Sequence, residues 1–399
     1  AQNRAAVFLC LPLGPVPSSA PRAQVLGAGP TGALAALALA QAGWRVQLCD
    51  PLSAAALAER SRAYALTHSS RELLEQLDLW RPLAPHLAPF RSLELCDRAT
   101  GDQVSFRGAD LPPDAAAAGD PAVGWILQHA PLMQVLLAAV AQQPAIEACL
   151  GREPQREAGM DLVVAADGHR SPSRRAARIH QWSRPYRQGC LTVQVGLRGS
   201  APDQAWELFR PEGPFAVLPL GGEAFQLVWS APIERLRRLE QLEPVAFLEA
   251  LSAALPERLQ PEVLLDQPRA FPVALEVAWP LRRGRLVVVG EAAHRSHPVG
   301  GQGLNLCWRD VQELGRLAAL VSAGRLGVRR LPGRYARRRW LDILLVLLAT
   351  DALVRIFSNR APLLLPLRRL ALAALARWRW LRCLSLGAMT LGPCRLPLG

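Results

Sequence analysis

The sequence predicts a mixed α/β (α+β) fold, in which a parallel sheet is combined with an antiparallel sheet and a helical C-terminal segment. Three observations support this prediction. Apolar strands run directly into polar or glycine-bearing turns and then into helices around residues 23–50, 161–179 and 285–323. Apolar or alternating segments follow one another between residues 191 and 230, as expected of a sheet. From residue 331 onward, Arg, Leu and Trp are mixed on helical stretches with few acids.

The first strand–turn–helix segment, AQVLGAGPTGALAALALAQAGWRVQLCD, carries the spacing Gly27-x-Gly29-x-x-Gly32 at its turn. Gly27 makes the turn, Gly29 allows the backbone to approach a pyrophosphate, and Gly32 allows the predicted helix over residues 31–42 to pack closely on the strand. The second strand ends at Asp50, where a carboxylate accepts the ribose hydroxyls of an adenosine. This order predicts a Rossmann-like FAD/NAD(P)-binding domain. A glycine turn in an unrelated α/β unit is the alternative.

Two further segments have the same organisation. The strand LVVAA ends at Asp167-Gly168 and precedes a serine-rich helix start and a basic helix. The strand over residues 285–289 is followed by GEAAHRSHPVGGQGLNLCWRD, whose helix is predicted to begin between Gly303 and Asn305. Because strands of one parallel sheet end at the same edge, we expect these three turns to lie together.

The second sheet is predicted from the segments LTVQVGLRG, PFAVLPL and EAFQLVWS, which span residues 191–199, 214–220 and 223–230. Their residues either alternate between apolar and polar or are apolar throughout, which is typical of antiparallel strands that cover a core.

The composition is that of a globular protein, with half of the residues apolar and a net charge of +13. All basic residues are arginines, and the excess lies in residues 321–399, which hold 15 Arg against two acids. Eight cysteines without a CxxC spacing argue against a zinc ribbon or a disulfide framework and favour a reducing, cytoplasmic setting.

The apolar run ILLVLLA is far shorter than the roughly 20 residues of a membrane-spanning helix. The N-terminal residues 5–23 are interpreted as an irregular leader rather than a secretory signal. The arginine-rich segment has two open interpretations. It is either a surface that meets acidic lipid headgroups, which would place the protein at the inner face of a membrane, or a helical cap with solvated arginines. No recognisable nucleic-acid module is present, so nucleic acid is not expected as a partner.

The chain resembles the FAD-dependent aromatic hydroxylases of the para-hydroxybenzoate hydroxylase superfamily. Within it, the chain is most similar to ring hydroxylases of ubiquinone biosynthesis, of the 2-octaprenyl-6-methoxyphenol hydroxylase type. The resemblance covers nearly the whole chain from residue 23. It rests on motifs that occur in the order of the family, namely GAGPTG, RAYALTHSSRELLEQLDLW, GWILQHAPLMQVLL, DLVVAADG, RPEGPFAVLPL, GEAAHRSHPVGGQGLNLCWRDV and YARRRWLDILLVLLATDALVRIFSN.

The resemblance implies FAD as cofactor, NAD(P)H and O2 as co-substrates, and a phenolic, prenylated substrate. It implies that the first turn holds the FAD pyrophosphate, that Asp50 binds the ribose, that Arg62 approaches the phosphates and that Glu291 binds the ribityl chain. Gln128 would line the flavin edge, and Pro298 would lie against the ring, with the following helix start facing its N1 and C2 edge. The cofactor-binding residues expected on this basis are Gly27, Ala28, Gly29, Pro30, Thr31, Gly32, Asp50, Arg62, Gln128, Asp167, Gly168, Glu291, Pro298, Gly300, Gly301, Gln302, Gly303, Leu304 and Asn305.

The catalytic residues stay open at this point. Pro298 and His297 are candidates by position, and Tyr186 and Tyr64 join His297 as candidates for the base that forms a phenolate. His294 and His297 lack a Cys or acid at ligand spacing on a common element, so no metal is expected. His294 is interpreted as a packing residue.

The resemblance implies a division of the chain into six parts and leaves two other classes of function. We expect FAD-binding parts at residues 22–90, 120–180 and 285–325, substrate-domain parts at 91–119 and 181–284, and arginine-rich helices at 326–399. The alternatives are a same-fold reductase or other oxidoreductase, and a degenerate subunit of a quinone-biosynthesis complex. Three departures from the family support the second alternative: the short connection at 145–160, Ala130 in place of arginine, and Glu291 in place of aspartate.

Overall fold

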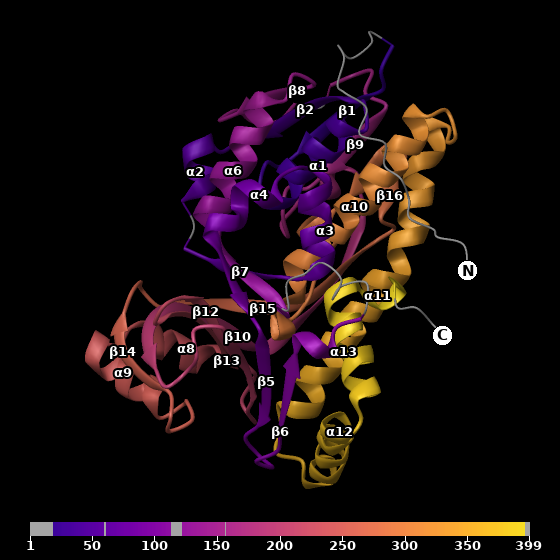
Figure 1. The fold of residues 1–399 in the computed structure, drawn as a ribbon. Helices are drawn as coiled ribbons and strands as arrows, with labels where there is room; N and C mark the ends of the chain where they lie inside the picture. The colour runs from indigo at the N-terminus through magenta and orange to yellow at the C-terminus, as the bar shows by residue number, and fades with distance from the viewer. Residues whose placement is uncertain (1–18, 60, 113–121, 156, 396–399) are drawn as a thin grey trace.

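The computed structural model describes residues 19–59, 61–112, 122–155 and 157–395. Its upper half in Figure 1 is built around a six-stranded sheet in which every pair is parallel except the last pair at one edge. Because β1, β9 and β17 are neighbours and parallel, their turns meet at one edge, as expected. In sheet order the strands are β16 Arg282–Arg283, β17 Leu286–Val288, β9 Leu162–Ala165, β1 Arg22–Leu26, β2 Arg45–Asp50 and β8 Ile146–Leu150.

Apolar helices build the core of this half. Helix α1 is buried almost all round, which its run of Ala and Leu permits, and it packs between two other helices. Trp44, at the end of the turn after α1, is fully buried and donates its indole N–H to the carbonyl of Ala318 in α10 at 3.2 Å. The helices of this half are α1 Pro30–Gln41, α2 Ala54–Ala58, α3 His68–Gln76, α4 Trp80–Leu83, α6 His129–Gln142, α7 Pro172–Ala176 and α10 Gln302–Ser322.

The lower half is a nine-stranded sheet, and a small three-stranded sheet joins the two halves. The segments predicted as antiparallel strands lie in β10, β12 and β13, but β10 begins already at His180 and runs for 19 residues. All pairs of the large sheet are antiparallel except β5 with β11. Its strands are β5 Ser92–Asp97, β6 Gln103–Arg107, β10 His180–Arg198, β11 Gln204–Phe209, β12 Phe215–Gly221, β13 Ala224–Pro232, β14 Gln260–Leu264, β15 Arg269–Trp279 and β18 His294–Arg295, and those of the small sheet are β3 Ala63–Leu66, β7 Gly124–Gln128 and β4 Leu87–Phe90.

Helices cover the large sheet from different sides. Helices α8 Ile233–Glu240 and α9 Pro244–Ser252 pack on one face through Leu236, Phe247 and Leu251. The C-terminal helices α11 Leu331–Phe357, α12 Leu365–Arg377 and α13 Arg379–Leu391 lie along the other side of the molecule (Figure 1). In the part of the chain described above, no helix is long and apolar enough to cross a membrane.

A buried network of charges joins the C-terminal helices to the upper half. The Asp310 carboxylate of α10 accepts from Gly290 N at 2.9 Å, pairs with His294 Nε2 at 2.7 Å and accepts from Arg339 Nε at 2.6 Å. Arg339 and Arg309 both reach Asp342 Oδ2, at 2.7 and 2.9 Å. Burial alone would raise the pKa of Asp310, but His294 and Arg339 outweigh it and hold that pKa below its ordinary value.

We predict that Asp310→Ala lowers the free energy of unfolding by about 3–5 kcal/mol, because it leaves the buried His294 without its acid and removes one of the two acids that pair with Arg339. Urea unfolding followed by circular dichroism measures this loss. Glu262→Ala, which removes an exposed partner of Arg198, is the control and should cost less than about 1 kcal/mol. Equal losses in the two variants would contradict a stabilising role for the network.

Candidate functional site

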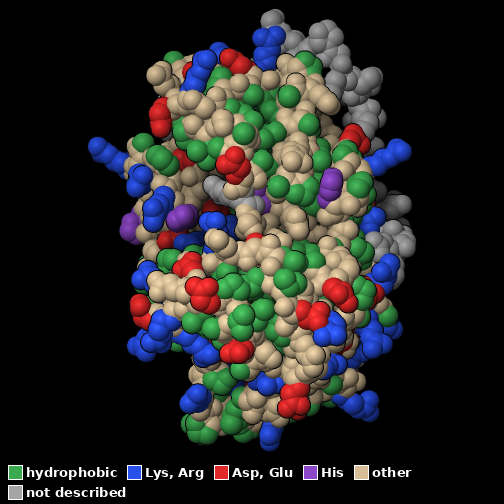
Figure 2. All heavy atoms as spheres, turned by 90° about the vertical axis from the view of Figure 1, so that its left-hand side faces the viewer, with side chains coloured by type: hydrophobic (Ala, Val, Ile, Leu, Met, Phe, Trp, Pro, Cys, Tyr) green, Lys and Arg blue, Asp and Glu red, His purple; other side chains and the backbone are tan. Residues whose placement is uncertain are grey.

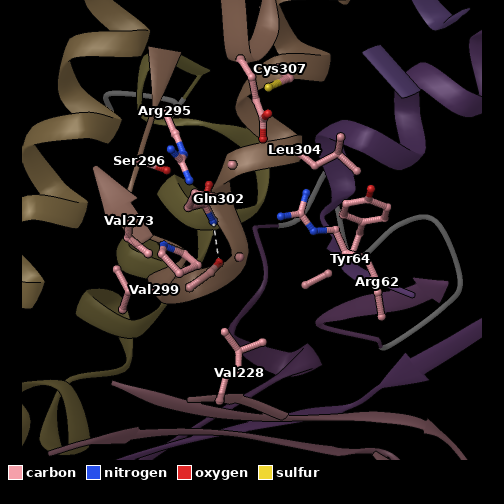
Figure 3. Close-up of a pocket in the computed structure, with 18 of the residues that line it drawn as sticks. Arg62, Tyr64, Val228, Val273, Arg295, Ser296, Val299, Gln302, Leu304 and Cys307 are labelled. Atoms are coloured by element: carbon pink, nitrogen blue, oxygen red, sulfur yellow. Dashed lines mark hydrogen bonds between the residues drawn. The ribbon is translucent and has the colours of Figure 1, made fainter. Parts of the chain in front are cut away.

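A cavity of about 1660 Å³ lies where the two halves meet and is the candidate site. The molecule is visibly hollowed between its two halves in Figure 2, with arginine and histidine side chains at one side of the hollow. In Figure 3, Arg62 and Tyr64 reach the cavity from one side, Arg295 and Ser296 from the other, and Val228 rises from the sheet beneath. The cavity is larger than the ~300–1,000 Å³ of an ordinary small-molecule pocket. It can therefore hold a large cofactor together with a second molecule.

The first turn approaches the neighbouring strands so closely that side chains are excluded. A Cβ on Gly32 would lie 1.7 Å from the carbonyl oxygen of Gly27, and one on Gly27, whose φ is 102°, would lie 2.5 Å from the oxygen of Ala166. Helix α1 can begin against β1 only because both positions are glycine. Gly27, Gly29, Pro30 and Thr31 line the cavity.

Asp50 and Arg62 both line the cavity. The Asp50 carboxylate accepts from Ala28 N at 2.7 Å and from Leu52 N at 2.8 Å, one bond for each oxygen. A carboxylate has further lone pairs, so Asp50 can still accept ligand hydroxyls. Arg62 lies over the ring of Phe271, with 5.9 Å from the guanidinium carbon to the ring centroid. No carboxylate pairs with Arg62 among the described residues, so its charge is available to an anion.

The long turn before α10 forms the middle of the cavity wall. Gly300 and Gly301 have φ angles of 67° and 62°, so two consecutive residues adopt the left-handed conformation that favours glycine. This double turn directs the N-terminal end of α10 toward the cavity, and Pro298, Gln302, Gly303 and Leu304 line it together with both glycines. Glu291, on the short 3-10 turn Gly290–Ala292, also lines it. Gln302 Nε2 donates to the carbonyl of Gly300 and to that of Met389 in α13, both at 3.2 Å (Figure 3).

Four predicted cofactor residues do not line the cavity, namely Ala28, Gly32, Gln128 and Asn305. The side chain of Asn305 is fully buried and holds the segment after β3. Its Oδ1 accepts from Thr67 N and from the Ser70 hydroxyl, at 3.0 and 2.6 Å, and its Nδ2 donates to the Ala65 carbonyl at 2.8 Å. Gln128, the last residue of β7, is exposed at the surface instead.

His297, a catalytic candidate by position, is not among the residues that line the cavity. The turn directs its ring inward, where it is fully buried and packs edge-to-face on Tyr186 with ring centroids 5.2 Å apart. Its Nδ1 accepts from Val299 N at 3.2 Å, and burial lowers the pKa of His297 to about 4. Tyr186 does not line the cavity either. Its hydroxyl donates to Asp351 Oδ1 at 2.9 Å, and burial raises the pKa of Tyr186.

The other sequence candidates reach the cavity but have structural partners. Tyr64 lines it and shares a hydrogen bond of 2.8 Å with His129 Nδ1. Asp167 and Gly168 line it as well, while Asp167 accepts from the Ser171 hydroxyl and from Ser173 N at the start of α7. His294 lines it and is bound to Asp310, in agreement with its interpretation as a packing residue. No group of three potential metal ligands is found in the described parts of the chain.

Three acids of the cavity wall, Glu59, Glu153 and Glu207, are not among the predicted site residues, and of these only Glu207 is buried. Glu207, on β11, is 7% exposed and lines the cavity between apolar residues. Its Oε2 accepts from Gly300 N at 3.3 Å, and burial raises the pKa of Glu207 to about 7. The segment QAWELF carries a usable signal, because the period of a strand places Ala205, Glu207 and Phe209 on one face, and an acid between two apolar residues on a buried face is unusual.

The remainder of the wall is apolar. It is contributed by the large sheet on one side and by the C-terminal helices on the other. The side chains of this end include Leu95, Phe106, Phe209, Leu218, Val228, Ile356, Phe357, Leu372, Leu375 and Met389.

Comparison with known proteins shows the family to which the chain belongs. The sequence pattern of a protein family whose description is "FAD binding domain" matches residues 22–129 and 137–341. The chain therefore belongs to this family, and the resemblance inferred from its motifs is confirmed, as is the mixed α/β fold.

The chain is similar to two enzymes of ubiquinone biosynthesis along almost its whole length. It is 30% identical over 380 residues to 3-demethoxyubiquinol 3-hydroxylase of Escherichia coli, which covers 88% of this chain and 94% of that protein. It is 31% identical over 411 aligned positions, gaps included, to the ubiquinone hydroxylase UbiL of Rhodospirillum rubrum. This alignment covers 95% of this chain and 93% of that protein. Among solved structures, p-nitrophenol 4-monooxygenase of Pseudomonas putida shares the fold, with a TM-score of 0.76, 18% identity and coverage of 94% and 99%.

The cavity fits the cofactor of the family. Gly29 and Gly303 both line it, have no left-handed φ, and would carry a Cβ with no protein atom within 4 Å. Neither backbone conformation nor protein packing demands glycine at these two positions. The space that a side chain would occupy is left for a ligand, at the N-terminal ends of α1 and α10, where unpaired N–H groups favour phosphate and other anionic groups.

We predict that Gly29→Ala weakens FAD binding at least about tenfold, or ~1.4 kcal/mol, because its methyl group projects into the pyrophosphate end of the cavity. Titration of the apoprotein with FAD, followed by flavin fluorescence, measures the affinity. Gly327→Ala is the matched control, since Gly327 also has an ordinary φ and an open Cβ position but lies outside the cavity. Unchanged affinity in Gly29→Ala would place the pyrophosphate elsewhere.

Proposed function

We propose that this protein is an FAD-dependent monooxygenase that hydroxylates the aromatic ring of a polyprenylated phenol, a precursor of ubiquinone or of a related quinone, with NAD(P)H and O2. The observation that carries the proposal is the continuous cavity, which runs from the glycine turns of the six-stranded sheet to an apolar chamber above the nine-stranded sheet. FAD, when bound, supplies the activation of O2. The protein supplies orientation and a site without bulk water.

The residues of the polar end are assigned to the cofactor. Gly27, Gly29, Pro30 and Thr31 would hold the pyrophosphate at the start of α1, and Asp50 would accept the ribose hydroxyls. Arg62 would approach the phosphates as a planar donor. Support for these roles comes from the position of all these residues in the cavity wall and from the bond that joins Asp50 to Ala28 N of the first turn.

The turn before α10 is assigned to the flavin ring. Glu291 would bind the ribityl chain with a longer arm than the aspartate usual in the family, and Pro298 would contact the ring. The N-terminal end of α10, at Gly303 and Leu304, would stabilise negative charge on the reduced ring, because the helix dipole favours an anion there.

A second, basic cavity is assigned to NAD(P)H. It has about 800 Å³ and shares His169, Phe271 and Arg295 with the main cavity. Its other lining residues include Arg170, Arg175 and Arg178. Such a cluster of guanidinium groups suits the phosphates of a nicotinamide dinucleotide. Its position beside the main cavity would bring the nicotinamide close to the flavin.

The test is turnover of the purified protein with bound FAD. We predict that a 2-prenylphenol accelerates NAD(P)H oxidation and gains one oxygen atom, detected by mass spectrometry, with the label of 18O2. NAD(P)H oxidation without oxygen insertion would favour the reductase alternative. A protein that binds FAD but never oxidises NAD(P)H would favour a degenerate subunit of a quinone-biosynthesis complex.

We also propose that the C-terminal helices contact the inner surface of a membrane, where a polyprenylated substrate is dissolved. On α12, Leu367 and Leu370 are exposed, and Leu363 just before it is 90% exposed. Exposed arginines at 360, 369, 377 and 379 lie in the same segment. Leu367 and Leu353 are both exposed and line the cavity, so the apolar surface continues into the site. Apolar side chains flanked by arginines fit an acidic lipid surface.

Co-sedimentation with phosphatidylglycerol vesicles tests this contact. We predict binding that weakens with salt and that falls several-fold in the double variant Leu363→Gln/Leu370→Gln, because these side chains would no longer enter the apolar layer. Val245→Gln is the matched control, since Val245 is 71% exposed but lies on α9, on the opposite side of the molecule from α12 (Figure 1). Equal binding by all three proteins would contradict the proposed contact.

A further inference from the structure

Glu207 is placed by the register of the large sheet in an apolar part of the cavity wall. Its Cα partner on β5 is Leu95 and its partner on β12 is Ala216, which is in turn the partner of Val228 on β13. All four residues line the cavity. A carboxyl group in this position has lost water without gaining a charged partner, because no cation pairs with Glu207 among the described residues.

The hydrogen bonds of Glu207 leave one oxygen available. Oε2 accepts from Gly300 N of the turn assigned to the flavin ring, whereas Oε1 accepts from no residue in the described parts of the chain. Glu207 therefore stands between that turn and the apolar chamber.

The elements packed against Glu207 contribute little charge. β5, β12 and the turn present Leu95, Ala216 and Gly300, which do not titrate. The titratable group that interacts with it is the thiol of Cys190 on β10, which is bonded to the Ser230 hydroxyl at 3.0 Å. Burial raises the pKa of Cys190 to about 12, so this thiol stays neutral. Since burial raises the pKa of Glu207 to about 7, its two protonation states are both populated near neutral pH.

A second acceptor lies on the same face of the sheet. Gln226 stands two residues before Val228 on β13 and also lines the cavity. Its Nε2 donates to the carbonyls of Val193 and Leu227, both at 3.1 Å, which fixes the orientation of the amide. Its Oε1 is buried and has no donor among the described residues. An unsatisfied buried acceptor is rare, and this one, on the same sheet face as the open oxygen of Glu207, suits a ligand that brings O–H donors.

We propose that Glu207 is the catalytic base that accepts the proton of the substrate's ring hydroxyl, and that Gln226 orients the ring as a second acceptor. This inference rests on the proposed function. The ring O–H bond breaks, the proton moves to Glu207 Oε1, and the electron pair stays on the ring oxygen. The ring becomes electron-rich as it takes the oxygen atom that O2 and the reduced cofactor supply. The proton of the attacked ring carbon then ends on the newly added oxygen, and Glu207 returns its proton to the original ring oxygen, which leaves the carboxylate ready for another turnover.

The experiment compares the wild type with Glu207→Gln and Glu207→Asp, each as FAD-loaded full chain. The probes are 2-geranylphenol and its O-methyl ether, which has no hydroxyl proton. In the wild type, kcat with the phenol should rise with pH through about 7, because only the carboxylate accepts a proton. Glu207→Gln should lower kcat about 10²–10⁴-fold at pH 8 and remove this rise, with partial recovery in Glu207→Asp.

Binding provides a readout that does not need turnover. Changes in the absorbance of bound FAD should show that the wild type prefers the phenol over the ether at pH 8, and Glu207→Gln should lose this preference while FAD affinity stays the same. A glutamine variant that keeps the wild-type rate, pH profile and preference would overturn the proposal. The wild type could hydroxylate neither probe and still bind the phenol more tightly than the ether, with this preference lost in Glu207→Gln. That result would contradict only the proposed reaction.

Discussion

The carboxylate of Asp310 joins the segments on which the site depends. It accepts from Gly290 N, pairs with His294 and accepts from Arg339, so one side chain of α10 connects the end of β17, the short strand β18 and helix α11. A buried charge is stable only when it is paired and hydrogen-bonded, and this one has partners on both oxygens. The position of the turn before α10, and therefore of the cavity wall that it forms, follows from this requirement.

The cavity has two chemically different ends because two kinds of sheet contribute to it. At the end of the parallel strands, glycine turns expose backbone N–H groups and leave room for a large ligand. At the other end, strands of the nine-stranded sheet present every second side chain, and these are mostly apolar. The turn at Gly300 lies where the two meet, and its contact with Glu207 is a direct link between them.

Part of the C-terminal segment is the helical cap that one interpretation of its sequence predicted. Arg339 and Arg368 are buried and meet Asp310 and Asp97, so part of the segment is a cap fixed by ion pairs. Val354, Phe357 and Leu386 complete the core between this cap and the large sheet. The leucines that face outward on α12 have no such partners in the described structure, and this outer face carries the proposed membrane contact.

The sequence by itself determined the nature and order of the elements around the first sheet. The spacing of Gly27, Gly29 and Gly32, and the acid at Asp50, are local signals, because each depends on a turn and the residues next to it. The same holds for the double glycine before α10. These signals predicted the common edge of the three turns, and the family was predicted from them together with the other motifs and their order.

Only the tertiary structure decided which side chains reach the cavity. His297 and Asn305 belong to the motif that bends around the site, yet one packs on Tyr186 and the other binds Thr67 and Ser70. Glu207 lies far from that motif in the chain and reaches the cavity through the pairing of β11 with β5 and β12. Segments distant in sequence determine whether a side chain is buried and which groups it bonds to. The pKa of a buried group follows from these contacts. A local pattern such as QAWELF can mark an unusual residue, but only these long-range contacts show whether it holds the fold or faces a ligand.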